Sequence, residues 1–424
     1  MKILVLNCGS SSVKFQLLET DAESARAGTD RALAKGLVEN IGGTAALKFE
    51  VPGRKPVKET AEILEHTVAV EKVLGFLTDA GNGLLRDRRE IAAVGHRVVH
   101  GGERFKASAL ITDDVLQGIE ACFDMAPLHN PPNVRGYQAV RAVLPDVPQV
   151  AVFDTSFHQT MPAEAYLYGL PYVLYQRHGI RRYGFHGTSH RFVSARLASL
   201  LGRSPDDAGL RLITCHLGNG SSVAAIRGGR SLDTSMGFTP LEGLVMGTRS
   251  GDVDPAAVLH AMEREEIGVG QANAMLNKHG GLLGISGVSH DMRALLEAEG
   301  QGNARAGLAV DVFCYRLRKY VAAYIGVLGG VDGLAFAGGI GENSAAIRAR
   351  ALAGLEGLGV SVDASLNAAA RGSETEISPP GAATRVFVVP TNEELLIARD
   401  TCAIVSGTPS SSGVTQQSKP ASGE

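Results

Sequence analysis

The protein is a chain of 424 residues with a mass of 44.4 kDa, which is long enough for two domains or one large domain. Hydrophobic residues make up 44% of the chain and charged residues 20%, which excludes a chain that is disordered throughout. The net charge of −3 gives no electrostatic argument for binding nucleic acid or an anionic membrane surface. Glycine is frequent, at 52 residues, but lacks the triplet period of collagen, and so predicts many tight loops.

The chain has no run of about 18 apolar residues, so no transmembrane helix is expected. The apolar run before Asn7 is too short for the core of a signal peptide. The 5 cysteines are far apart and form no C-x-x-C pair, which is typical of reduced thiols rather than of a disulfide framework or a zinc site. We therefore expect a soluble cytoplasmic protein.

Strand-like and helix-like patterns alternate along the chain, which predicts an α/β fold. In chain order, strands are expected at residues 3–6, 13–18, 91–99, 150–153, 212–217 and 334–337. Apolar residues at helical spacing predict helices over 61–77 and 311–328, and Pro131 with Pro132 could open a helix that runs to Leu144. Residues 406–424 are rich in Ser, Gly, Pro and Gln, which predicts a disordered tail.

One pattern occurs twice, about half a chain apart. Gly9-Ser10-Ser11-Ser12-Val13 follows one apolar strand, and Gly220-Ser221-Ser222-Val223 follows another about 211 residues later. Repetition at this interval suggests two related domains, each offering a loop to a shared cleft. In a glycine-rich chain the recurrence could also arise by chance.

Three glycine loops follow apolar strands, at residues 7–12, 218–222 and 338–343. Small residues let backbone N–H groups converge on phosphate oxygens, and Lys14 lies where its charge could reach a phosphate. Each loop could equally be an ordinary hairpin turn, and the third could simply start a helix. The chain contains neither a P-loop nor a Rossmann fingerprint, so the usual phosphate motifs are excluded.

Longer segments resemble the acetate kinase family. The matching segments, in order, are LVLNCGSSSVK (4–14), GHRVVHGGE (95–103), FDTSFH (153–158), YGFHGTSH (183–190), TCHLGNGSSVA (214–224), MGTRSGDVDP (246–255), AGGIGENS (337–344) and PTNEEL (390–395). The resemblance covers residues 1 to about 406 and implies two ribonuclease-H-like, actin-like ATPase domains with a nucleotide cleft between them. The domains expected are 1–156 completed by the C-terminal helix 394–405, and 157–393, followed by the tail.

Phosphoryl transfer depends on positioning and charge neutralisation, which directs attention to arginines. By spacing alone, Arg97 in its strand reads as a structural ion-pair partner, and Arg249 near Asp252 and Asp254 as half of a surface ion pair. The resemblance implies instead that Arg97 binds the acetate carboxylate and Arg249 stabilises the phosphoryl group in transfer. Asp154 follows a strand, where it could cap a turn; the resemblance makes it essential, and we assign it to orienting the metal-bound phosphate and acetate.

Twelve histidines raise the possibility of a metal site, but no H-E-x-x-H motif occurs, so zinc is not expected. Without the resemblance, each histidine would more often be a hydrogen-bonded structural residue. The resemblance implies that His186 stabilises the transition state and that His129 and His216 also belong to the active site.

Thr391 and Glu394 have capping-box spacing, which gives Glu394 a structural role and leaves Glu393 available for another. By resemblance Glu393 and Asn7 are associated with Mg²⁺ (or Mn²⁺), an ion that keeps most of its waters. Asp291 and Arg293 could form a helix-start ion pair; their segment otherwise matches the nucleoside site. The residues expected to bind ATP or ADP are Ser10, Ser12, Lys14, His216, Leu217, Gly218, Asn219, Gly220, Asp291, Met292, Arg293, Gly339, Ile340, Gly341, Glu342 and Asn343.

The resemblance therefore implies a Mg²⁺-dependent acetate kinase that reversibly transfers the γ-phosphoryl group of ATP directly to acetate, as a cytoplasmic homodimer. A propionate kinase is the nearest alternative, because one methylene discriminates weakly. The acyl pocket expected by resemblance comprises Val99, Leu128, Phe185 and Pro240. A chaperone-like ATPase would need a partner-binding domain after the ATPase, and a sugar kinase would not explain the motifs.

Overall fold

The computed structural model describes residues 1–408, which form two compact units. Unit 1 comprises Met1–Phe157 together with the chain from Asn392, and unit 2 comprises His158–Thr391. These limits lie one residue and two residues from the domain limits expected above. The predicted tail begins at Ser406, which is the last residue of a helix, and residues 409–424 of that prediction lie outside the described part of the chain.

Unit 1 is built on an eight-stranded mixed sheet in the order β5-β4-β3-β2-β1-β6-β8-β7. The strands β1 to β5 are antiparallel neighbours, whereas β6 lies parallel to β1 and β8 parallel to β6. The strands are β1 (Lys2–Cys8), β2 (Ser12–Glu19), β3 (Arg31–Glu39), β4 (Gly43–Glu50), β5 (Val57–Ile63), β6 (Ile91–Val98), β7 (Ala109–Leu110) and β8 (Gln149–Phe153).

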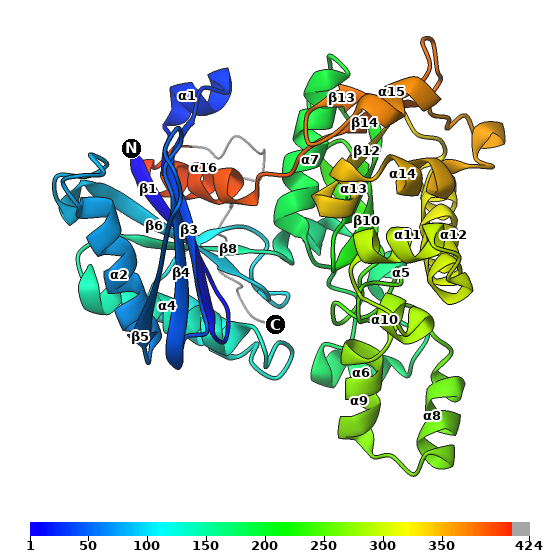
Figure 1. Ribbon diagram of the computed structural model, residues 1–424, viewed down its shortest axis with the longest axis horizontal. Helices are drawn as coiled ribbons and strands as arrows, with labels where there is room; N and C mark the ends of the chain where they lie inside the picture. Colours follow the sequence, from blue (N-terminus) through cyan, green and yellow to red (C-terminus); the bar gives the residue numbers. More distant parts are fainter. Residues whose placement is uncertain (409–424) are drawn as a thin grey trace, which may run out of the picture. The chain divides into compact units, whose positions relative to one another are not determined.

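Helices cover both faces of this sheet (Figure 1). Because side chains alternate along β1, Leu4 and Leu6 pack with α2 and α4, whereas Ile3 and Val5 pack with α16. The helices of unit 1 are α1 (Ala22–Ala27), α2 (His66–Thr78), α3 (Asp113–Glu120), α4 (Asn130–Val143), which has prolines at its first positions as expected, and α16 (Glu393–Ser406).

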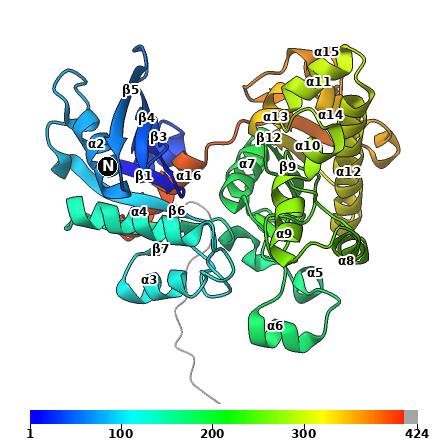
Figure 2. The ribbon, with the colours of Figure 1, turned by 60° about the horizontal axis from the view of Figure 1, so that its bottom comes forward.

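Unit 2 contains a six-stranded sheet in the order β11-β10-β9-β12-β14-β13. Its strands are β9 (Arg211–Leu217), β10 (Ser221–Arg227), β11 (Arg230–Thr234), β12 (Gly333–Ala337), β13 (Thr375–Glu376) and β14 (Arg385–Val388). The long helix α12 (Ala304–Leu328) packs Phe313 and Leu317 on one face of the sheet, and α7 (Gly187–Leu200) contacts β9 and β12. Figure 2 shows α12 and α7 from a second direction.

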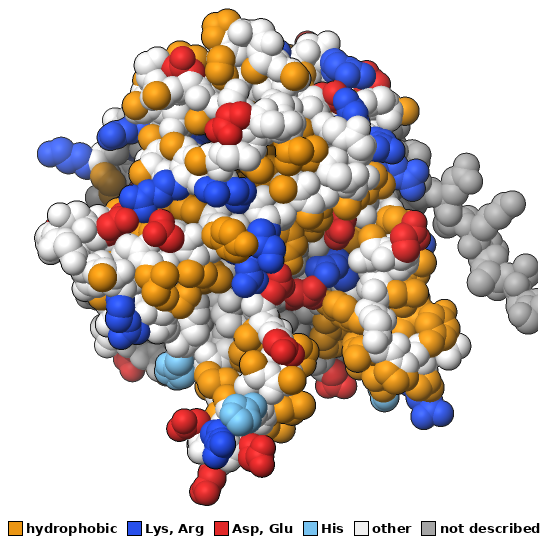
Figure 3. Space-filling model, turned by 90° about the vertical axis from the view of Figure 1, so that its right-hand side faces the viewer, with side chains coloured by type: hydrophobic (Ala, Val, Ile, Leu, Met, Phe, Trp, Pro, Cys, Tyr) orange, Lys and Arg blue, Asp and Glu red, His pale blue; other side chains and the backbone are white. Residues whose placement is uncertain are grey.

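The remaining helices of unit 2 are inserted before and between the strands. They are α5 (Ala163–Tyr166), α6 (Tyr172–His178), α8 (Pro255–Arg264), α9 (Val269–Lys278), α10 (Gly281–Ser286), α11 (Met292–Gly300), α13 (Gly338–Asn343), α14 (Ala345–Leu352) and α15 (Ala364–Ala369). Helices α5 and α6 precede β9, α8 to α11 lie between β11 and β12, and α13 to α15 lie between β12 and β13. On the face of the protein drawn in Figure 3, acidic and basic side chains are interspersed with apolar ones. Within the described residues no helix is long and apolar enough to cross a membrane.

The two sheets share one topology. In unit 1 the order β3-β2-β1-β6-β8 has two antiparallel pairings followed by two parallel ones, and β11-β10-β9-β12-β14 in unit 2 repeats this order and sense. The repeated Gly/Ser segments are the turns of the equivalent hairpins β1–β2 and β9–β10. The repeat predicted from the sequence is therefore a duplicated fold of the ribonuclease-H-like type.

Three details differ from the prediction. The stripe over 61–77 is wrong at its start, because 61–63 end β5 and α2 begins only at His66; Ile63 is fully buried in a strand. Helix α12 begins at Ala304, seven residues before the predicted 311, with Asn303 as its N-cap. The capping box of Thr391 and Glu394 is also wrong: the N-cap of α16 is Asn392, whose side chain accepts from the N–H of Leu395.

Candidate active site

Unit 1 brings an arginine and two carboxylates together at one edge of its sheet. Arg97 lies near the end of β6 and Asp154 directly follows β8, and these parallel strands end at the same edge. Arg97 Nε donates to Asp154 Oδ1 at 3.2 Å, and Arg97 Nη2 donates to Asp154 Oδ2. Glu393, the first residue of α16, places its Oε2 at 3.8 Å from Arg97 Nε. Asp154 is only 1% exposed, whereas the Arg97 side chain keeps 21% of its surface exposed.

The charges in this cluster keep Arg97 protonated. Burial lowers the pKa of Arg97, but the negative charges of Asp154 and Glu393 outweigh burial and raise that pKa overall. One edge of the guanidinium is engaged by Asp154, and among the described residues no hydrogen bond is made by Nη1 of Arg97. The second edge can therefore accept a planar anion such as a carboxylate.

The first glycine loop is the tight β1–β2 turn, closed by a hydrogen bond of 2.8 Å from the N–H of Gly9 to the carbonyl oxygen of Ser12. Ser10 lies in this turn. Lys14, on β2, forms an ion pair with Glu394 and keeps 55% of its side chain exposed. Glu394, for which the sequence predicts a capping role, therefore pairs with Lys14, the lysine expected near a phosphate.

Asn133 of α4 was not singled out from the sequence. Its Oδ1 accepts from the N–H of Val99 at 3.1 Å, and its Nδ2 donates to the carbonyl oxygen of Cys8 at 2.9 Å. Asn130 likewise holds the N–H of His100 at 3.1 Å. Both amides are buried and tie α4 to the ends of β1 and β6. In the sequence, Pro131 and Pro132 predict a helix start but give no indication of a role for the asparagines on either side of them.

Unit 2 brings Arg249 and His186 together over the second glycine loop. A Cβ built on Gly220 would lie 3.4 Å from Arg249 Nη1 and 3.5 Å from Cε1 and Nε2 of His186. Arg249 donates to the carbonyl oxygen of Pro240 at 3.1 Å and contacts Met246 Sδ at 3.8 Å. Among the described residues no carboxylate forms an ion pair with Arg249, and burial lowers its pKa.

The proposed surface ion pair of Arg249 is thus wrong, because the two nearby carboxylates bind other groups. Asp252 accepts from the N–H of Gly243 and from Tyr320, and Asp254 caps α8. A half-buried guanidinium whose only side-chain partners within residues 1–408 are a carbonyl oxygen and a sulfur favours a site for an anion.

His186 belongs to a cluster of four histidines beside α7. It is the N-cap of α7 with φ of 57°, and its ring lies 4.3 Å from that of His216. His186 Nδ1 and His190 Nε2 both contact the hydroxyl of Ser222, at 2.9 and 2.7 Å. Burial lowers the pKa of His190 and brings that of His158 to about 4, so these two rings are neutral at pH 7.

A cavity of about 530 Å³ lies within unit 2, a volume typical of small-ligand sites. Its walls include eight of the residues expected at the nucleotide, namely Gly218, Asn219, Asp291, Met292, Arg293, Gly339, Ile340 and Asn343. Residues not anticipated are His290, Leu296 and Ser344. Gly341 and Glu342 lie in α13 away from this lining, and Glu342 Oε1 accepts from the N–H groups of Gly338 and Thr391.

The other expected residues are placed as follows. Asp291 is the N-cap of α11 and forms an ion pair with Arg293, which confirms the predicted ion pair at a helix start. The same two residues also line the cavity. His216 and Leu217 end β9, and His216 Nδ1 contacts Ser189 Oγ at 2.7 Å. His129 precedes α4.

The four expected acyl-pocket residues are divided between the units. Val99 is buried and Leu128 is 70% exposed in unit 1, whereas Phe185 is buried and Pro240 is partly exposed in unit 2.

Among the described residues no three His, Cys, Asp or Glu side chains are grouped to hold a metal ion by themselves. Asp154 and Glu393 nevertheless present two carboxylates to one guanidinium, which leaves an excess negative charge beside it. Oxygen donors with an excess negative charge suit a hard cation that retains most of its waters.

Two units of one topology, the second with a nucleoside-sized cavity, define the class of duplicated actin-like folds. Over residues 2–399 the chain matches the profile of the Acetokinase family. The acetate kinase of Desulfitobacterium hafniense is 54% identical over 407 residues, which cover 96% of this chain and 99% of that relative.

Two solved structures extend the comparison. A crystal structure of the acetate kinase of Porphyromonas gingivalis has a TM-score of 0.90 and 48% identity, covering 95% of this chain and 99% of that one. A propionate kinase from Francisella tularensis has a TM-score of 0.85 and 42% identity, covering 94% and 98%. The chain belongs to the acetokinase family and is a kinase.

Proposed function

We propose that the protein transfers the γ-phosphoryl group of MgATP to acetate, giving acetyl phosphate and ADP, and catalyses the reverse reaction. The observation that carries the proposal is Arg249, a half-buried guanidinium without a carboxylate partner among the described residues, which lies with His186 over Gly220. Such a group stabilises the charge that develops on a transferring phosphoryl group. The family match supplies the expected acceptor.

On the donor side, unit 2 would bind the nucleotide. The cavity between α11 and α13 would take the nucleoside, with Asn219 and Gly339 in its walls. The phosphates would extend toward Gly220, where backbone N–H groups and Arg249 meet them. Arg249 and His186 then act on the phosphoryl oxygens by charge and hydrogen bonding.

On the acceptor side, unit 1 would bind the carboxylate. Arg97 holds Asp154 with its Nε and Nη2 and offers its other edge to acetate. A carboxylate is already a nucleophile at pH 7, so no general base is needed. Asp154, almost completely buried, orients the guanidinium rather than accepting a proton.

Glu393 and Asn7 would hold Mg²⁺, largely through water. When bound, the ion neutralises charge on the phosphate oxygens. Glu393 suits this role because its carboxylate lies beside the Arg97–Asp154 pair, where the net charge is negative.

Propionate is the alternative acceptor, because a relative of this chain is a propionate kinase. One methylene is worth only about 1–3 kcal/mol of discrimination, so partial use of both acids is expected. A homodimer and a cytoplasmic location belong to the same proposal, and light scattering of the purified protein tests the first of these.

The test is MgATP-dependent formation of acyl phosphate from acetate, trapped with hydroxylamine. Arg249→Ala should lower kcat by about 10²–10³-fold, as expected for loss of one transition-state donor. Arg196→Ala is the matched control, because this arginine of the same unit forms a surface ion pair with Glu374. No acyl phosphate from the folded protein, or equal rates for the two variants, would contradict the proposal.

A further inference from the structure

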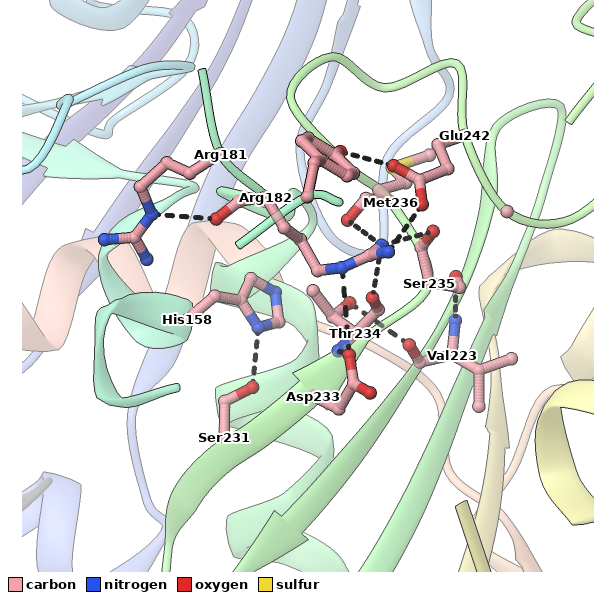
Figure 4. A network of polar contacts seen from close by, with 12 residues as sticks. His158, Arg181, Arg182, Val223, Ser231, Asp233, Thr234, Ser235, Met236 and Glu242 are labelled. Carbon is pink, nitrogen blue, oxygen red and sulfur yellow. Dashed lines mark hydrogen bonds and ion pairs between the residues drawn. The ribbon is translucent and has the colours of Figure 1, made fainter. Parts of the chain in front are cut away.

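A partly buried polar network in unit 2 joins Arg182 to Glu242 (Figure 4). At its centre Arg182 Nη1 donates to the carbonyl oxygens of residues 234–236 at 2.9, 3.1 and 3.1 Å. Arg182 Nη2 donates to Glu242 Oε1 at 2.5 Å. Four contacts from one guanidinium thus join the end of β11 to a residue eight positions further along the chain.

A tyrosine completes the hold on Glu242. The hydroxyl of Tyr168 donates to Glu242 Oε2 and accepts from the N–H of Phe238 at 2.8 Å. Both carboxylate oxygens of Glu242 are therefore engaged. A carboxylate with both oxygens bonded and partly buried has one favoured position, and so does the backbone that carries it.

A glycine makes room for this arrangement. A Cβ built on Gly237 would lie 1.7 Å from Glu242 Oε2 and 2.3 Å from the hydroxyl oxygen of Tyr168. The φ angle of Gly237 is not in the left-handed region, so backbone conformation does not require glycine there. What requires glycine is the close approach of the Glu242–Tyr168 pair.

The network reaches the proposed phosphoryl site through Pro240. Pro240 lies two residues before Glu242, and its carbonyl oxygen is the only oxygen within the described residues that accepts a hydrogen bond from Arg249. The loop has a second anchor, because Asp252 accepts from the N–H of Gly243, the residue after Glu242, at 2.8 Å and from Tyr320 at 2.8 Å. The hydrogen bond to Pro240 thus links the guanidinium of Arg249 to the part of the loop that Glu242 holds.

We propose that Glu242, held by Arg182 and Tyr168, is a positioning residue that sets the guanidinium of Arg249 through the carbonyl oxygen of Pro240. This inference rests on the proposed function, in which Arg249 acts on the phosphoryl group. Loss of the hold lowers kcat, because Arg249 loses its alignment. The nucleoside cavity has no lining residue in this network, so the KM for ATP stays nearly constant.

The decisive experiment is a double-mutant cycle on kcat for acyl phosphate formation. Glu242→Gln alone should lower kcat by about 10- to 100-fold, since a misplacement of about 1 Å can cost 10²-fold. In an Arg249→Ala background the same change should alter kcat less than about twofold, because Glu242 acts through Arg249. Equal factors in both backgrounds would overturn the proposal and leave Glu242 a merely structural role.

Gly237→Ala tests the same point without removing a charge, because its methyl group displaces Glu242 and Tyr168. It should reproduce the loss of kcat and the constant KM for ATP. Gly326→Ala is its control, since a Cβ there meets nothing within 4 Å. Glu299→Gln, which breaks an ion pair with Arg350 in the same unit, is the control for Glu242→Gln. Both controls should keep the parent kcat.

A readout independent of activity separates the two proposals. In a crystal structure of Glu242→Gln, or of Tyr168→Phe should the first variant not fold, the Arg249 guanidinium should leave the Pro240 carbonyl oxygen. An unmoved guanidinium overturns the inference. If the parent protein makes no acyl phosphate, the proposed function fails, and the crystal structure alone decides the positioning claim.

Discussion

Replacing Arg249 by glutamine should stabilise the protein while it removes activity. Arg249 is a half-buried charge whose partners are the carbonyl oxygen of Pro240 at 3.1 Å and the sulfur of Met246 at 3.8 Å. Exchanging a charged for a neutral hydrogen bond costs about 1 kcal/mol. Relief of the desolvation of a half-buried guanidinium returns about 2 kcal/mol. The expected net gain in the free energy of unfolding is about 1 kcal/mol.

This gain corresponds to a rise of about 2–4 °C in the Tm of a unit of this size. The assay is thermal unfolding followed by circular dichroism at constant pH and salt. Arg97→Gln is the matched control with the opposite sign, because Arg97 neutralises Asp154, which is 1% exposed. A fall in Tm for Arg249→Gln as large as that for Arg97→Gln would refute the reasoning that Arg249 lies in the protein without a compensating charge.

Three further outcomes are expected. Arg97→Ala should lower the free energy of unfolding by about 3 kcal/mol in urea titrations, because the buried Asp154 carboxylate loses its guanidinium. Adding Asp154→Asn should restore more than half of the lost stability, because no buried carboxylate is then left unpaired. No recovery would contradict the ion pair. Asp291→Ala should lower the free energy of unfolding by about 1 kcal/mol, because it removes the N-cap of α11. It should also raise the KM for ATP severalfold at constant kcat, and an unchanged KM would contradict a role of this part of the cavity in nucleotide binding. Burial lowers the pKa of His158 from 6.5 to about 4, so only the unfolded chain takes up its proton as pH falls through 6.5. Stability is therefore lost toward pH 4, and His158→Gln should remove about 2 kcal/mol of the loss between pH 7 and 5; an identical pH profile would contradict a neutral buried ring.

The central strands could be predicted because they are short apolar runs bounded by glycine and serine turns. Both hairpins of the repeat followed from this signal, and so did β6 and β8. The failure at 61–63 has a physical cause, since Ile63 is buried in β5 yet also fits the helical stripe of α2. The first turns of α12 were missed because 304–310 are rich in alanine and glycine, whose side chains give a weak apolar period.

The site could be predicted only where residues lie in one segment or match a family motif. Arg97 and Asp154 meet because β6 and β8 lie parallel and adjacent in the sheet. The sequence around either residue does not indicate this pairing. The Arg182–Glu242 contact joins residues 60 positions apart and follows no sequence period. Asn133, which ties α4 to β1 and β6, was hidden for the same reason. Such contacts arise from tertiary packing, which a single sequence does not encode in a local pattern.

The most direct test of the proposed activity is kcat/KM for acetate, propionate and butyrate with MgATP, measured by hydroxylamine trapping of the acyl phosphate. We predict the highest value for acetate, with propionate lower by up to about 10–200-fold, the factor that one methylene can supply. A higher value for propionate would keep the proposed roles of Arg97 and Arg249 but make the protein a propionate kinase. No acyl phosphate from any of the three acids, in protein shown to be folded, would contradict the account.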